Sequence, residues 1–220
     1  MKKLSEKQKK LNINEAAKRL EAVYPSAECA LKYNGEPWKL LVMGRLSAQC
    51  TDARVNIVCE ELFARFPTLY ELAYGELDEI ARIVRPCGLF NTKAKNIKDA
   101  CLMLVTTYNG VLPDSMDELL KLPGVGRKIA NLLLGDIYGL PSIVADTHCI
   151  RICGRLGMYD QKLKDPTRVE KILTKLVLPG YQTDFCHRIV QFGRDTCSAR
   201  SPKCNECVLG DICLHNRNKE

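Results

Sequence analysis

The chain has 220 residues, of which 46% are hydrophobic and 27% charged, and its formal net charge is +7. This length allows one large domain or two small ones with a real core, and no apolar run approaches the roughly 20 residues of a membrane span. The basic start, MKKLSEKQKK, is not followed by an apolar segment, so we expect no secretory signal and a cytoplasmic location. The positive charge favours an anionic partner, of which nucleic acid is the commonest kind.

Apolar residues recur at intervals of three and four along almost the whole chain, and alternation of period two is hard to find. This pattern predicts an all-α fold, with helices of roughly 8–16 residues joined by short loops. The predicted helical segments are, in chain order, residues 12–24, 37–49, 55–66, a helix after 68, then 76–86, 92–108, 116–121, a helix from 127, then 165–180 and 183–197. The residue pairs expected to cap helix starts are Asn12 with Glu15, Thr68 with Glu71, and Ser115 with Glu118.

One stretch, LPGVGRKIANLLLG at residues 122–135, places two glycines between a helix that ends and one that begins. Pro123 forbids further helix because it lacks an N–H group and restricts the residue before it. Gly124 and Gly126 permit positive φ angles and close approach by another backbone. From Arg127 a new helix is expected, and the backbone N–H groups at its start would form an anion site. A tight turn between helices, with no ligand, would account for the two glycines equally well.

The longer spacing Leu-Pro-Gly-Val-Gly-Arg-Lys resembles the helix-hairpin-helix motif of the DNA glycosylase superfamily. In that family the hairpin grips one DNA strand by its backbone, so the resemblance implies that double-stranded DNA is the partner. The hairpin residues that would bind DNA by this match are Leu122, Gly124, Val125, Gly126 and Arg127.

A second matching segment follows the hairpin. The sequence VADTH at residues 144–148 resembles the family's Val-Asp-Thr-His stretch. An aspartate before a threonine is commonly a helix N-cap, but together with the hairpin the match implies a catalytic pair of Lys128 and Asp146. Thr147 and His148 would then lie beside the DNA.

The twelve cysteines are unevenly placed. Eight are scattered singly and are expected to be small buried hydrophobes. The other four have the spacing Cys197-x6-Cys204-x2-Cys207-x5-Cys213, which suits a metal centre. Zinc is one interpretation, but a zinc ribbon usually pairs two CxxC knuckles and this tail has one. The spacing matches the [4Fe–4S] loop of the endonuclease III branch, which implies a structural iron–sulfur cluster.

The resemblance runs from about residue 14 to the last cysteine and implies further DNA contacts. LSAQCTDARVN resembles a family segment in which Gln49 would enter the space left by a flipped nucleotide, and GLFNTKAKNI one in which Leu89 would wedge into the base stack. Three basic side chains near the cluster could meet phosphates: Arg194, Arg200 and Lys203. The chain departs from the family pattern at Gly44-Arg45, which we expect to interrupt a helix, and at Cys50, Cys87 and Phe90.

The family architecture implies two α-helical domains. A six-helix domain with the hairpin would span residues 30–140, and an iron–sulfur cluster domain would combine residues 1–29 with 141–220. The DNA site would lie in the cleft between them, with Lys128 opposite Asp146. Because no apolar run is long enough to span a bilayer, we expect no membrane partner, and because nothing suggests a symmetric interface, a monomer associated with the nucleoid is our default expectation.

The implied activity is that of a bifunctional DNA N-glycosylase and AP lyase that removes oxidised pyrimidines. Lys128 would attack the sugar C1′ as a neutral amine, and Asp146 would stabilise the positive charge that develops on the sugar. β-Elimination from the lysine Schiff base would then cut the strand 3′ to the abasic site. The alternatives are a glycosylase for thymine or uracil opposite guanine, a catalytically idle DNA-binding module and a zinc-ribbon protein.

Overall fold

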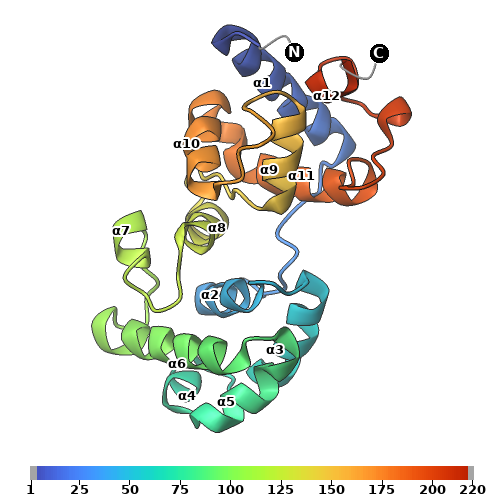
Figure 1. The fold of residues 1–220 in the computed structure, drawn as a ribbon. Helices are drawn as coiled ribbons and strands as arrows, with labels where there is room; N and C mark the ends of the chain where they lie inside the picture. The colour runs from blue at the N-terminus through green and yellow to red at the C-terminus, as the bar shows by residue number, and fades with distance from the viewer. Residues whose placement is uncertain (1–3, 218–220) are drawn as a thin grey trace. The chain divides into compact units, whose positions relative to one another are not determined.

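The computed structural model describes residues 4–217, and over that range it contains α-helices, short 3-10 helices and no strand (Figure 1). The prediction of an all-α fold is therefore confirmed. The chain divides into two compact units, and each has its own hydrophobic core. We call residues 29–138 the hairpin unit, and residues 4–28 with 139–217 the cluster unit. No helix within the described range is long and apolar enough to cross a membrane.

The hairpin unit is built around its longest helix, α6, against which α4, α5 and α2 pack. Its core includes Leu40, Leu62 and Ile97, all fully buried. The helices of this unit are α2 (Pro37–Leu46), α3 (Asp52–Arg65), α4 (Leu69–Tyr74), α5 (Leu77–Val84), α6 (Phe90–Thr107), α7 (Met116–Leu119) and α8 (Arg127–Tyr138). A short 3-10 helix, η1 (Arg85–Cys87), precedes α6.

Local capping chemistry sets several of these helix starts. Thr68 and Glu71 form the predicted capping box at the start of α4, because each side chain accepts a hydrogen bond from the other residue's backbone N–H. Ser115 accepts from the backbone N–H of Glu118 and begins α7. The α2 helix continues through Gly44 and Arg45, so the expected interruption is wrong. At Gly44 this helix packs against α8, and a Cβ there would make ordinary contacts with Ile129 at 3.4 Å and Leu132 at 3.6 Å.

The cluster unit packs α1 (Glu6–Val23) against the later helices of the chain, α10 (Pro166–Leu176) and α11 (Gln182–Asp195). The α9 helix (Thr147–Arg155) also packs against α11, and a short helix, α12 (Leu214–Arg217), follows the last cysteine. Ile13, Leu20 and Phe185 are fully buried in this core. A 3-10 helix precedes α11 (η2, Pro179–Tyr181), and another carries the second cluster cysteine (η3, Cys204–Glu206).

Two sequence predictions differ from the structure in this unit. The first helix begins at Glu6 rather than at the expected Asn12 cap, because the Ser5 hydroxyl accepts a hydrogen bond from the backbone N–H of Gln8. Asn12 is instead buried inside α1. The sequence pattern also gave no helix at residues 147–155, where α9 lies. Of the eight scattered cysteines, six are buried as expected, and Cys29 and Cys50 are half-buried.

Candidate active site and metal centre

The hairpin is a short loop whose two apolar residues anchor it in the core. The side chains of Leu122 and Val125 are 2% and 7% exposed, and the backbone N–H of Val125 donates to the carbonyl of Leu122 at 3.1 Å. With their side chains buried, these two residues can offer a ligand only backbone groups. Gly124 has φ +77°, a left-handed conformation that favours glycine, and α8 begins at Arg127 as predicted.

Two polar side chains, Arg45 and Asn96, pack directly against Gly124. A Cβ at this position would lie 2.7 Å from Nε of Arg45 and 2.8 Å from Cβ of Asn96. With its amide oxygen turned toward Arg45, Asn96 accepts hydrogen bonds from Nη2 at 3.0 Å and Nε at 3.2 Å. Burial lowers the pKa of Arg45. Arg45, the unusual arginine of α2, therefore packs against the hairpin and is held there by Asn96. By contrast, a Cβ at Gly126 would meet nothing within 4 Å.

Lys128 is the second residue of α8 and is exposed beside the hairpin. The exposed Gly126 lies two residues before it, so the lysine projects from the first helical turn after the open glycine. The positive end of the helix dipole lies in this turn and favours bound anions. The structure thus places the candidate nucleophile next to a candidate phosphate site, on the same rigid loop and helix.

Asp146 lies in the cluster unit as the N-cap of α9. Its Oδ1 accepts a hydrogen bond from the backbone N–H of Cys149 at 2.7 Å, and its own N–H donates to the carbonyl of Val144 at 2.9 Å. The carboxyl group is half-buried and fixed in orientation by these contacts. Thr147 is exposed, and the ring of half-buried His148 lies 3.2 Å from Nη2 of Arg151.

Gln49 and Leu89, the candidate stack-entering residues, have the same unusual backbone. Both have left-handed φ angles, 56° and 48°, which non-glycine residues rarely adopt. Both side chains are exposed, and Leu89 is 61% accessible. The two loops lie side by side in the hairpin unit, because Nζ of Lys93 donates to the backbone carbonyls of both Ala48 and Cys87. The unusual cysteines beside them also interact, and burial, followed by the Cys50 thiol, raises the pKa of Cys87 to about 11.

The four tail cysteines line one cavity. Within residues 4–217 no three His, Cys, Asp or Glu side chains are arranged to hold a single metal ion. A [4Fe–4S] cluster does not need such a site, because each of its irons takes one thiolate. Four thiols around one cavity fit that group, with Cys197, Cys204, Cys207 and Cys213 as the ligands. When bound, it supplies the covalent links that join the segments of this tail.

Two arginines of α9 hold the first part of the cluster loop. Nη1 of Arg155 donates to the Cys197 thiol at 3.2 Å and to the carbonyl of Ser198 at 2.7 Å, and Nη2 donates to that of Ala199 at 2.8 Å. Arg151 donates to the carbonyl of Cys197 at 3.0 Å. A hydrogen bond to a ligand sulfur stabilises negative charge on it, so Arg155 is suited to tune a bound cluster.

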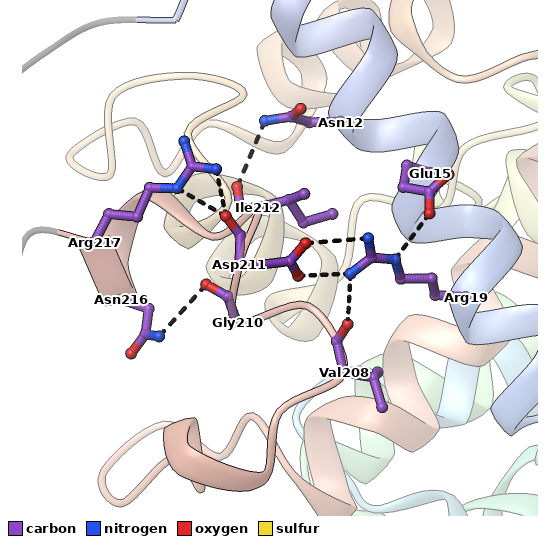
Figure 2. A network of polar contacts seen from close by, with 9 residues as sticks. All are labelled: Asn12, Glu15, Arg19, Val208, Gly210, Asp211, Ile212, Asn216 and Arg217. Carbon is purple, nitrogen blue, oxygen red and sulfur yellow. Dashed lines mark hydrogen bonds and ion pairs between the residues drawn. The ribbon is translucent and has the colours of Figure 1, made fainter.

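The α1 helix holds the second part of the loop (Figure 2). Arg19 donates to the two carboxylate oxygens of Asp211 at 2.6 and 3.1 Å, and to the carbonyl of Val208 at 2.9 Å. Asn12 donates to the carbonyl of Ile212 at 3.5 Å. These contacts lie between the third and fourth cluster cysteines, so the N-terminal helix helps to shape the metal centre.

Sequence reasoning missed the arginines that hold this loop, Arg19, Arg151 and Arg155. Their partners are distant in sequence, and no local pattern indicates them. The three basic residues expected to meet phosphates, Arg194, Arg200 and Lys203, are all exposed. The structure gathers the hairpin, Lys128, Gln49 and Leu89 in the hairpin unit, and Asp146 and the cysteines in the cluster unit. The approach of Lys128 to Asp146 stays a prediction.

Known proteins resemble this chain over most of its length. Residues 42–179 match the family described as HhH-GPD superfamily base excision DNA repair protein, and residues 197–213 match the iron–sulfur binding domain of endonuclease III. The endonuclease III of Synechocystis sp. is 45% identical over 195 residues, which are 88% of this chain and 88% of that protein. The endonuclease III of Bacillus subtilis is 39% identical over 199 residues, 90% of each chain. A structure described as a trapped endonuclease III–DNA covalent intermediate superposes with a TM-score of 0.88 at 38% identity, covering 96% of this chain and 98% of the other.

The fold and the matched segments define the class, which is that of the helix-hairpin-helix base excision DNA repair proteins. Within that class the chain belongs to the endonuclease III family. The resemblance inferred from the motifs is thereby confirmed. The iron–sulfur prediction is confirmed as well, and the zinc-ribbon alternative is wrong.

Proposed function

We propose that this chain is a bifunctional DNA N-glycosylase and AP lyase of base excision repair. The observation that carries the proposal is the placement of Lys128 in the first turn of α8, directly after the open glycine hairpin. A DNA strand held by its phosphates at the hairpin would bring its sugars close to the lysine amine. The family's known structures include a trapped covalent complex with DNA, which supports a covalent step.

Lys128 is the proposed nucleophile. The lone pair of its Nζ attacks C1′ of the damaged nucleotide, the bond from C1′ to the base breaks, and the base leaves with those electrons and takes up a proton. Opening of the sugar ring gives a Schiff base between C1′ and Nζ. Loss of a proton from C2′ then expels the 3′ phosphate by β-elimination. Each step uses the same lysine, so one substitution should abolish strand cleavage.

Asp146 is the proposed electrostatic partner. A carboxylate fixed by the start of α9 can stabilise the positive charge that develops at the sugar as the base departs, without reorganising. This role requires the two units to bring Asp146 to the sugar that Lys128 attacks. The trapping and rate measurements below test that requirement.

The proposed substrates are oxidised pyrimidines in double-stranded DNA, together with abasic sites. Removal of a base requires that it leave the stack, which costs a few kcal/mol. Gln49 and Leu89 are the proposed stack-entering side chains, because both are exposed and project from loops of the hairpin unit. Arg194, Arg200 and Lys203 are the proposed phosphate contacts near the cluster. We also place the protein, as a monomer, in the cytoplasm at the nucleoid, where its substrate lies.

Borohydride trapping tests the proposal. The substrates are one duplex with a single thymine glycol and one with a single abasic site, and the proteins are the wild type, Lys128→Ala and a matched control, Lys121→Ala. Lys121 is an exposed lysine seven positions earlier that is paired with Glu118. A covalent adduct with both duplexes, lost only in Lys128→Ala, is the expected result.

The other outcomes separate the alternatives. An adduct with the abasic duplex alone would keep the lyase and point to another base, which a panel with thymine or uracil opposite guanine would identify. Binding without an adduct or base release on any duplex would leave a catalytically idle DNA-binding module. An adduct that persists in Lys128→Ala would assign the nucleophile to another amine.

A further inference from the structure

Lys93, in the first turns of α6, is a lysine that lies wholly inside the hairpin unit. Its exposed fraction is 0%, and it is among the largest fully buried side chains of the protein. Its Nζ donates to three backbone carbonyls, those of Ala48 at 2.7 Å, Leu46 at 2.8 Å and Cys87 at 2.8 Å. An ammonium group has three N–H donors, so these bonds use all of them.

Burial of this ammonium group costs free energy. Burial disfavours the charged form and lowers the pKa of Lys93, and its three acceptors are neutral carbonyls rather than a carboxylate. A hydrophobic side chain of similar length would fill the same space without that cost. What only the ammonium provides is a rigid link among three carbonyls that would otherwise repel one another.

The positions of those carbonyls indicate what is linked. Leu46 is the last residue of α2, and Ala48 immediately precedes Gln49. Cys87 is the last residue of η1, two positions before Leu89. The ammonium therefore connects the loop of Gln49 to the loop of Leu89. Its acceptor in the first loop lies 45 residues from Lys93 in the sequence, and its acceptor in the second lies 6 residues away. Each loop presents an exposed side chain from a left-handed backbone, a conformation that persists only where the surroundings enforce it.

We propose that Lys93 is a positioning residue that fixes the spacing of Gln49 and Leu89, so that the two side chains enter the DNA stack together. The inference rests on the proposed function, because it assigns a task to residues of that same site. Lys93 does not touch the DNA. It acts by holding the two loops in one arrangement before DNA binds, so that no ordering is needed when the stack opens.

The same helix offers a matched control. Lys98 lies five positions later and donates to the backbone carbonyl of Gly75 at 2.6 Å. It thus also ties α6 to a loop through a carbonyl, but that loop joins α4 to α5 and carries neither stack-entering residue. Lys98→Met removes one lysine and one backbone contact from the same helix, while the loops of Gln49 and Leu89 keep their link.

The experiment compares wild type, Lys93→Met and Lys98→Met in single-turnover base release from two duplexes. In the first, thymine glycol is opposite adenine in an intact duplex. In the second, the same lesion is opposite a one-nucleotide gap, where the stack is already interrupted. We expect Lys93→Met to slow release from the intact duplex by roughly 10- to 100-fold. The loss should shrink to within about threefold opposite the gap, because little stack then remains to be opened. Lys98→Met should match the wild type on both.

A purely structural role for Lys93 would reduce both rates by the same factor, and that result would overturn the inference, as would an unchanged rate on the intact duplex. The triple variant Lys93→Met/Gln49→Ala/Leu89→Ala gives a second reading, and it should be no slower than Gln49→Ala/Leu89→Ala, because no stack-entering side chain is then left for Lys93 to position. Should the fluorescence of Trp38 show that Lys93→Met is unfolded, Lys93→Gln, which keeps amide donors, replaces it in the same comparison. A wild type that releases no thymine glycol from either duplex would overturn the proposed activity on oxidised pyrimidines and this inference with it, whereas an active wild type with a uniformly slow variant overturns only the inference.

Discussion

Asp146 accepts a hydrogen bond from the backbone N–H of Cys149 at 2.7 Å, so the proposed catalytic carboxylate is also the N-cap of α9. The two roles make different demands on the side chain. An N-cap needs only a short side-chain oxygen, which asparagine and serine also provide. Stabilisation of a developing positive charge needs the full negative charge of a carboxylate. Substitutions at this one position can therefore separate folding from chemistry.

We expect Asp146→Asn to slow base release by at least roughly 100-fold and to leave the free energy of unfolding nearly unchanged, since asparagine caps helices as well as aspartate does. Asp146→Ala should be equally slow and also lose about 1 kcal/mol of stability through the missing cap. Single-turnover base release and thermal unfolding measure the two effects. Asp146→Ser is the control for the cap alone. A normal rate in Asp146→Asn would remove this residue from the chemistry.

The two hairpin glycines should respond differently to the same substitution. Gly124 has φ +77°, and a Cβ there would lie 2.7 Å from Nε of Arg45, so Gly124→Ala should destabilise the hairpin unit by more than about 1 kcal/mol. Gly126 has open space around it, so Gly126→Ala should change stability by less than about 0.5 kcal/mol. The DNA affinity of Gly126→Ala should nevertheless fall, because the added methyl group would hold a DNA phosphate away from the backbone N–H groups of the hairpin.

Urea unfolding followed by Trp38 fluorescence measures the first effect, because Trp38 is the single tryptophan and lies in the hairpin unit. Anisotropy of a labelled abasic duplex measures the second. An unchanged affinity for Gly126→Ala would place the DNA backbone elsewhere on the hairpin.

The parts of the fold that depend on neighbouring residues were predictable. The box of Thr68 with Glu71 and the start of α8 after the glycines follow from short-range chemistry, and both are confirmed. The apolar pattern predicts too late a start for the first helix, because Ser5 caps the helix before that pattern begins. The sequence does not predict α9, since its nine residues are too few for a clear periodic pattern.

The parts that depend on distant contacts were not predictable. Lys93 reads in the sequence as an ordinary helical lysine, yet its ammonium binds a carbonyl 45 residues away. Arg19 looks like half of a local pair with Glu15, but it also binds Asp211, 192 residues further on. A family motif can indicate which side chains do the chemistry. The contacts that hold those side chains in place appear only when the chain is folded.

The contact between Arg19 and Asp211 should protect the metal centre. We expect Arg19→Met to speed loss of the cluster to a chelator or to air by several-fold, because it frees the segment between Cys207 and Cys213. Global stability should fall by no more than about 1 kcal/mol, since Asp211 is exposed, Arg19 is partly exposed, and the methionine keeps the packing of the arginine's aliphatic stem. Visible absorbance of the cluster follows its loss. Glu15→Gln, which breaks only the pair within α1, is the matched control. Equal rates in the two variants would show that Arg19 does not secure this loop.

A buried thiol should make the hairpin unit sensitive to alkali. Burial raises the pKa of Cys101 from 9.0 to about 12. Below pH 9 the thiol is protonated in both the folded and the unfolded chain, and its contribution to stability is fully present. Above pH 9 only the unfolded chain ionises there, so the free energy of unfolding should fall by about 1.4 kcal/mol per pH unit for this group, until the folded thiol itself ionises near pH 12.

Urea unfolding followed by Trp38 fluorescence between pH 8 and about 10 tests this dependence. Cys101→Ala is the comparison, because it lacks the thiol but shares every other titrating group with the wild type. Cys101→Ala should be less stable than the wild type at pH 8, because it lacks the packing of the sulfur. Its free energy of unfolding should decline less steeply with pH, and the difference in slope should correspond to about one proton. Burial raises the pKa of the Cys59 thiol as well, and that group acts in the same direction in both proteins, so it cancels in the comparison. Parallel pH profiles would mean that Cys101 ionises as readily in the folded chain as in the unfolded one.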